Sequence, residues 1–134
     1  MKVRCNVWIE IDGEVGLSEW RVALLEAVAA TGSISAAAER QGVHFRVAWR
    51  KIREMEARLG QRLVDGHAGG VGGGGASLTP DAEAMVRRFR AFTAGMEDEL
   101  EVRFRRHFPA AASDVPAAEG LSVLTHEVNA KPLT

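Results

Sequence analysis

Two helices predicted within residues 33–60 constrain the fold of this chain more than any other feature. The first, Ile34–Arg40, follows a serine that can cap it and contains three consecutive alanines, which allow close approach of another helix. Gly42 interrupts it, and a longer helix is expected over Phe45–Leu59, ended by Gly60. Two helices joined by a tight turn with glycine, the longer one second, are typical of a helix-turn-helix motif.

The longer helix has two chemically different faces. Arg46, Arg50 and Arg53 follow the spacing i, i+4, i+7 and share one side, which we expect to be exposed, with Lys51 and His44 flanking it. A projection at about 100° per residue gathers the apolar residues within about a third of the circle, and we expect these in the core: Phe45, Ala48, Trp49, Ile52, Met55 and Leu59.

The charge of this region favours an anionic partner. Residues 33–62 hold seven basic and three acidic side chains, although the whole chain has a net charge of -1. Surface arginines often serve only to solvate a helix. Here the stripe has one sign and follows a helix-turn-helix turn. Arginine can pair with phosphate or bond to guanine in the major groove, which admits one α-helix. We therefore expect nucleic-acid binding.

The flanking segments complete a small domain. Alternating apolar residues predict a strand over Val3–Ile11, and Ser18 can cap a helix over Glu19–Ala30. After the helix pair, short strands are expected at Arg62–Asp65 and Ala76–Leu78. Between them lie seven of the fourteen glycines of the chain, which we interpret as the tip of a hairpin.

A long helix is expected from Thr79 to His107, with Thr79 as its cap and Pro80 in its first turn. Because such a helix outruns the rest of the domain, part of its apolar stripe should be covered by a second subunit. We expect a homodimer whose interface includes the residues that form this stripe: Met85, Phe89, Phe92, Met96, Leu100 and Phe104.

These elements predict a mainly α fold with a small β-hairpin, namely a winged helix-turn-helix with a long C-terminal dimerisation helix. Residues 1–107 would form this domain, with the long helix at 79–107. Residues 108–134 read as an alanine- and proline-containing connector and a weakly ordered tail.

The glycine run has other interpretations. A phosphate-binding P-loop would need Gly-Lys-Ser/Thr entering a helix, and the run holds no lysine. A flexible interdomain linker is also consistent with its composition. Two rival functions follow for the whole chain: a winged-helix module that binds proteins instead of DNA, and a small enzyme or oxyanion carrier that uses the glycine loop.

Other signals predict little chemistry. Four scattered histidines and one cysteine, Cys5, have no metal-ligand spacing, and no nucleophile-base set falls in a recognisable motif. We expect no enzyme activity and no cofactor. No apolar run reaches the roughly 20 residues that a transmembrane helix needs, and no leader is recognisable. We expect a cytoplasmic protein without membrane contact.

Three stretches together resemble the N-terminal DNA-binding domain of ModE, the molybdate-responsive transcriptional regulators: GSISAAAERQGV at 32–43, AWRKIREME at 48–56, and GGVGGGGASLT at 69–79. The first stretch alone also resembles the LysR-type regulators. The resemblance covers about residues 3–107. It departs in two respects: Val71 stands where the family carries a lysine, and the chain ends where molybdate-binding Mop modules would begin.

The resemblance implies a homodimer that regulates molybdenum-related genes by binding operator DNA. Because the stretch that resembles the family ends before the Mop modules, we expect no molybdate binding by this chain. The resemblance also implies that the recognition helix uses His44, Arg46, Val47, Arg50 and Lys51, with Arg53 beside them, and that Ser33 and Ser35 hold phosphate. The wing would bring its backbone at Gly72 and Gly73, and the side chain of His67, to the DNA.

Overall fold

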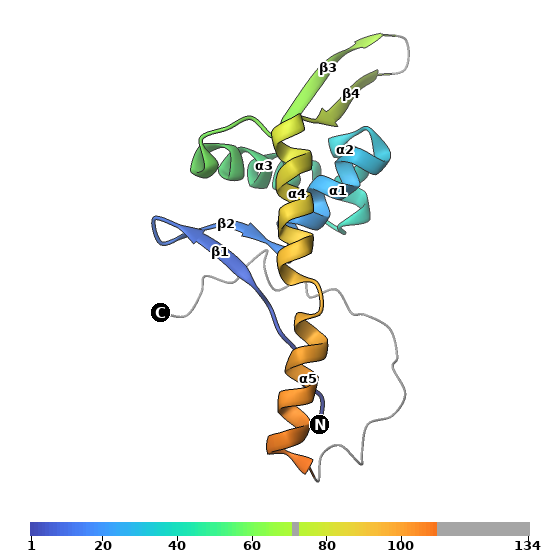
Figure 1. The fold of residues 1–134 in the computed structure, drawn as a ribbon. Coiled ribbons are helices and arrows are strands. Elements are labelled where there is room, and N and C mark those ends of the chain that lie inside the picture. Colours follow the sequence, from blue (N-terminus) through green and yellow to red (C-terminus); the bar gives the residue numbers. More distant parts are fainter. Residues whose placement is uncertain (71–72, 110–134) are drawn as a thin grey trace. The chain divides into compact units, whose positions relative to one another are not determined.

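The computed structural model describes residues 1–70 and 73–109, which are drawn in colour in Figure 1. The chain forms two compact units. One is Val7–Phe92, and the other combines Met1–Asn6 with the described residues from Thr93 onward. The prediction of a mainly helical winged helix-turn-helix is confirmed. The predicted connector and tail lie outside the described residues from position 110 onward.

The N-terminal strand is shorter than predicted and has a partner that the sequence did not reveal. Strand β1 spans Trp8–Ile11 and pairs antiparallel with β2, Glu14–Ser18. Trp8 lies opposite Ser18, which already caps the next helix. No residues of β2 therefore remain to pair with positions 3–7, and the prediction of a strand beginning at Val3 is wrong.

The first helix, α1 at Glu19–Thr31, matches the prediction to within one residue. The hydroxyl of Ser18 accepts a hydrogen bond from Arg21 N at 3.1 Å, as expected of an N-cap. One side of α1 supplies much of the core: Val22, Leu24, Leu25 and Val28 are each 0% exposed.

The helix pair has the predicted bounds, α2 at Ile34–Arg40 and α3 at Phe45–Leu59. Ser33 caps α2 by accepting a hydrogen bond from Ala36 N at 3.1 Å. The small side chains of α2 are used as expected, because Ala37 and Ala38 are buried against their neighbours. Ala48, Ile52 and Met55 are the buried residues of α3.

The wing is a two-stranded hairpin of β3, Val64–Gly70, and β4, Gly73–Leu78, that extends away from the helices (Figure 1). Both strands are longer than predicted, since glycines on each side of the run belong to the ladder. At the base, Ala76 N donates to Gly32 O at 2.7 Å, which fixes the hairpin to the residue that follows α1.

The predicted C-terminal helix is present as two consecutive helices, α4 at Pro80–Thr93 and α5 at Met96–His107. Thr79 caps α4, with its hydroxyl accepting from Ala82 N at 3.1 Å. The prediction of one unbroken helix is corrected at Gly95, whose φ of 76° lies in the left-handed region that ends helical hydrogen bonding.

Candidate nucleic-acid interface

The exposed side of α3 carries the predicted arginines. Arg46, Arg50 and Arg53 are exposed, and the side chains of Arg50 and Arg53 are 61% and 55% accessible to solvent. The opposite side of the helix is anchored in the core by Ala48 and Met55, which are fully buried. Because the helix is held on one side and basic on the other, it presents guanidinium groups from a rigid support.

Lys51 is less exposed than these arginines, and it shares Glu54 with Arg50, whose Nε lies 4.0 Å from Glu54 Oε1. The side chain of Lys51 is 12% exposed, and Nζ is 3.9 Å from Glu54 Oε2. The structure therefore places this predicted site residue in an ion cluster at the side of α3. Val47 is half-buried, and His44 is exposed immediately before α3 without a side-chain capping bond.

Glu54 is the centre of this ion cluster, which ties α3 to α1. Its Oε2 is 3.0 Å from Nη2 of Arg21 on α1, whose side chain is only 3% exposed, and 3.8 Å from Nη1 of Arg58. Burial by itself would raise the pKa of Glu54, but the hydrogen bond from Arg21 and the charges of Lys51, Arg21 and Arg58 outweigh it and lower the pKa below its usual value. The carboxylate therefore stays ionised and fixes the orientation of α3.

Arg21 is a positioning residue that sequence reasoning missed. It stands between apolar residues of α1, Trp20 and Val22, which are 4% and 0% exposed. A cation in such a run is rarely buried without a partner. That signal was available, but the identity of its partner, 33 positions away, was not.

Two aromatic side chains of α3 correct the predicted core. Phe45 and Trp49 are 49% and 45% exposed. The helical projection placed them beside the buried face, but they lie at its edge, and only about half of each residue is covered. The guanidinium carbon of Arg53 lies 5.0 Å from the centroid of the Trp49 ring, and Arg53 Nη1 is 3.3 Å from Glu56 Oε1. Arg53 is therefore partly engaged within α3.

The predicted phosphate contacts near α2 differ in availability. Ser33 is half-buried, and its hydroxyl already accepts the capping bond from Ala36. Ser35 is exposed.

On the wing, His67 is exposed, and its Nε2 lies 3.0 Å from the hydroxyl of Ser77 on the neighbouring strand. Gly73 is paired opposite Gly70, and the predicted contact at Gly72 lies outside the described residues.

The predicted dimer stripe is divided between two environments. On α4, Phe89 is 2% exposed and belongs to the core of the protomer, while Phe92 is 59% exposed; Met85 is half-buried. The α5 residues of the stripe are all half-buried: Met96, Leu100 and Phe104. Phe104 stacks on Phe108 with 5.1 Å between ring centroids.

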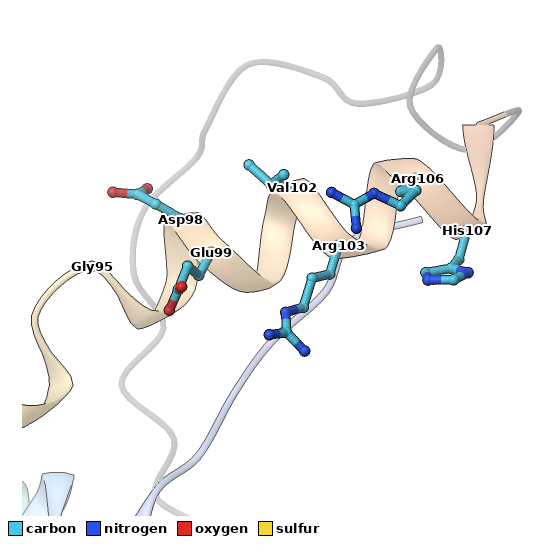
Figure 2. A pocket seen from close by; sticks show the side chains of 7 residues that line it. All are labelled: Gly95, Asp98, Glu99, Val102, Arg103, Arg106 and His107. Atoms are coloured by element: carbon cyan, nitrogen blue, oxygen red, sulfur yellow. The ribbon is translucent and has the colours of Figure 1, made fainter.

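A hollow of about 640 Å³ lies along α5, and Figure 2 shows the residues that line it. Its described lining comes from Gly95 and this helix alone, with acidic residues at one end and basic residues at the other: Asp98, Glu99, Val102, Arg103, Arg106 and His107. A ligand site usually gathers polar groups from several elements, and this lining is one face of one helix. Among the residues that the structure describes, no group of three or more His, Cys, Asp or Glu side chains is arranged to hold a metal ion.

Comparisons with known proteins agree with this geometry. Residues 21–83, from α1 to the start of α4, match the family described as bacterial regulatory helix-turn-helix protein, lysR family. The chain therefore contains a winged helix-turn-helix domain of the LysR type. In the described part of the chain, no helix combines the length and the apolar character that a membrane crossing requires.

More particularly, the N-terminal region is related to ModE and MopB proteins, which confirms the resemblance. The molybdenum-pterin-binding protein MopB of Rhodobacter capsulatus is 38% identical over 110 residues, which are 82% of this chain and 40% of MopB. The transcriptional regulator ModE of Yersinia pestis is 39% identical over 69 residues, which are 52% of this chain and 26% of ModE. The chain thus spans less than half the length of these relatives.

One solved structure extends the comparison to three dimensions. The DNA-binding domain of CbnR, in complex with DNA, is 28% identical to this chain. The aligned region covers 70% of this chain and 98% of that domain, with a TM-score of 0.46.

Proposed function

We propose that this chain binds operator DNA as a transcriptional regulator, with α3 as the helix that enters the major groove. The observation that carries the proposal is the exposed arginine side of α3, backed by buried Ala48 and Met55 within a LysR-type helix-turn-helix domain. In such motifs the second helix lies in the major groove and its N-terminal residues reach the base edges.

The exposed arginines have separate roles in this proposal. Arg46 and Arg50 lie in the first two turns of α3, and in this proposal they would contact a guanine edge or a phosphate. Arg53 lies a turn further along and is partly neutralised by Glu56, so we assign it a supporting contact to phosphate. Exposed Ser35 of α2 and exposed His67 of the wing would add contacts to the sugar-phosphate backbone of the DNA.

The relatives indicate the genes concerned. Three of them are named molybdenum-pterin-binding protein MopB, transcriptional regulator ModE and molybdenum transport protein ModE. We therefore propose operators beside molybdenum-related genes. The exposed Phe92 and the half-buried stripe of α5 support assembly as a homodimer, which would double the number of phosphate contacts.

The test is fluorescence anisotropy with a labelled random duplex at increasing salt. Arg46→Ala/Arg50→Ala should weaken binding strongly at low salt. Each lost phosphate contact should reduce the slope of log affinity against log salt by about 0.9. Arg87→Ala/Arg88→Ala is the matched control, because it removes the same charge from exposed positions of α4.

The control variant should bind as the unchanged chain does. If the unchanged chain binds no duplex at low salt, the proposed function is wrong and the alternative, a protein-interaction module, is favoured. If both double variants lose affinity equally, DNA binding depends on net charge alone and α3 is not the recognition helix.

A further inference from the structure

Phe45 and Trp49 form an exposed apolar ledge on the helix that otherwise presents arginine. They lie one turn apart at i and i+4, so their side chains are neighbours on the surface of α3. Almost half of each residue is exposed, 49% for Phe45 and 45% for Trp49. Leaving large aromatic surfaces in water forgoes the stabilisation that burial would bring. The ledge therefore needs an explanation.

Trp49 is held in place by a chain of contacts that ends at Leu63, the residue before β3. The guanidinium of Arg53 lies over its ring at 5.0 Å. Arg53 is paired at 3.3 Å with Glu56, whose side chain is 11% exposed. Glu56 Oε2 in turn accepts a hydrogen bond from Leu63 N at 2.8 Å. The ring is thus positioned in advance on the outside of the helix, as a recognition surface requires.

The position of the ledge limits what it can contact. Phe45 is the first residue of α3, and the exposed arginines Arg46 and Arg50 each follow one of the two aromatic residues in the sequence. A partner that contacts both the ledge and the adjacent arginines must offer apolar groups next to phosphates or guanine edges. The major groove of DNA offers one apolar group at its base edges, the C5-methyl of thymine.

We propose that Phe45 and Trp49 contact thymine C5-methyl groups and select thymine at one or two positions beside the bases or phosphates held by Arg46 and Arg50. This inference rests on the proposed DNA binding by α3 and adds to it a specificity that does not depend on hydrogen bonds.

The experiment begins with sites selected by the unchanged chain from a random duplex library. The best site is resynthesised with each thymidine replaced in turn by deoxyuridine, which removes the methyl group and keeps every hydrogen-bonding group of the base pair. Affinity should fall about fourfold for each contacted methyl, the effect expected of one buried methyl group. It should stay unchanged at the other positions.

The variants assign the effect to the ledge. At one contacted position, Phe45→Ala should bind the thymidine site and the deoxyuridine site with equal affinity. Trp49→Ala should lose the preference in the same way, at that position or at the neighbouring one. Trp8→Ala is the matched control: Trp8 is 40% exposed on β1, outside the site, and this variant should keep the full preference for thymidine. Circular dichroism verifies that each variant is folded, and Phe45→Leu, which keeps an apolar side chain, should retain part of the preference.

The possible failures are distinguishable. If the unchanged chain binds deoxyuridine sites as well as thymidine sites at every position, or if Phe45→Ala and Trp49→Ala both keep the preference, the ledge does not select thymine while DNA binding stands. If no duplex is bound at low salt, the proposed function fails and this inference fails with it.

Discussion

Helices α4 and α5 carry consecutive parts of one apolar stripe, yet they use it differently. On α4, Ala82 and Phe89 are 0% and 2% exposed, and Arg90 bonds to Glu19 and Glu26 of α1. On α5, no residue from Met96 to His107 is buried. The same periodicity therefore reaches the core at Phe89 of α4, whereas Phe92 of α4 is 59% exposed and the stripe residues of α5 are half-buried. Periodicity identifies a face, and only a neighbouring element decides whether that face is covered.

The largest expected effect comes from truncating the stripe where it is buried. Phe89→Ala should lower the free energy of unfolding by about 3–5 kcal/mol, because it leaves a cavity in the core. Phe104→Ala removes the same atoms from α5 and should cost under about 1 kcal/mol in a dilute chain. Urea unfolding at low protein concentration measures both. Equal losses would show that α5 is as much a core element as α4.

A second contrast concerns acidic residues. Glu54→Gln should cost about 1–3 kcal/mol at pH 7, because buried Arg21 loses its charged acceptor. The folded-state pKa of Glu54 is lowered, so its stabilisation is present above its usual pKa of 4.5 and is lost as pH falls below that value. The difference between Glu54→Gln and the unchanged chain should therefore shrink in acid.

Glu101→Gln is the matched change on α5. Glu101 pairs with Arg105 at 3.0 Å on an exposed surface, so this variant should stay within about 0.5 kcal/mol of the unchanged chain at pH 7. Unfolding measured from pH 3 to pH 7 tests both variants. If the difference in unfolding free energy between Glu54→Gln and the unchanged chain stays constant across this range, the stabilisation does not depend on the ionisation of Glu54.

The accessible part of the stripe should matter for assembly. If α5 contributes to a homodimer, Phe104→Ala should weaken dimerisation about tenfold or more, as expected for a buried aromatic at an interface. Val102→Ala, at a 59% exposed position off the stripe, should leave the dimer unchanged. Sedimentation equilibrium measures the dimer dissociation constant of each variant. An unaltered dimer in Phe104→Ala would exclude the α5 stripe from the interface.

The smallest loss expected from breaking a contact between two helices concerns the attachment of α4 to α1. Hydrogen bonds with Glu26 and Glu19 raise the pKa of Arg90 above its usual value, but these side chains are 37% to 55% exposed, so solvent weakens the pairs. Arg90→Met should therefore cost about 0.5–1 kcal/mol. Thermal unfolding should show this loss diminishing at high salt. A loss that salt does not change would indicate packing by the arginine stem instead.

Much of the fold could be predicted because its signals are local. Ser18, Ser33 and Thr79 each precede a helix, and each makes the expected capping bond. The break at Gly95 was hidden because the step from Phe92 to Met96 keeps the helical spacing of the stripe across it.

The candidate site was predictable only in part. The exposed arginines followed from spacing within α3. The exposure of Phe45 and the burial of Arg21 against Glu54 depend on which elements meet in space, and no local pattern encodes that. The strand β2 was missed for a related reason. Its last three residues, Gly16 to Ser18, are all buried because the strand packs against α1 and α3, so burial does not alternate along it.

The bond between Ala76 N and Gly32 O has a consequence for how this wing can change over evolution or be engineered. Below the tip, the ladder from Val64 opposite Leu78 to His67 opposite Gly75 is fixed to the body of the domain. A Cβ added at Gly75 would lie 3.4 Å from Gly32 O, in ordinary van der Waals contact with the residue that anchors the hairpin. Residues inserted between Gly70 and Gly73 would leave this base in register. The wing can therefore be lengthened, or the residues at its tip substituted, without a change in the domain that supports it.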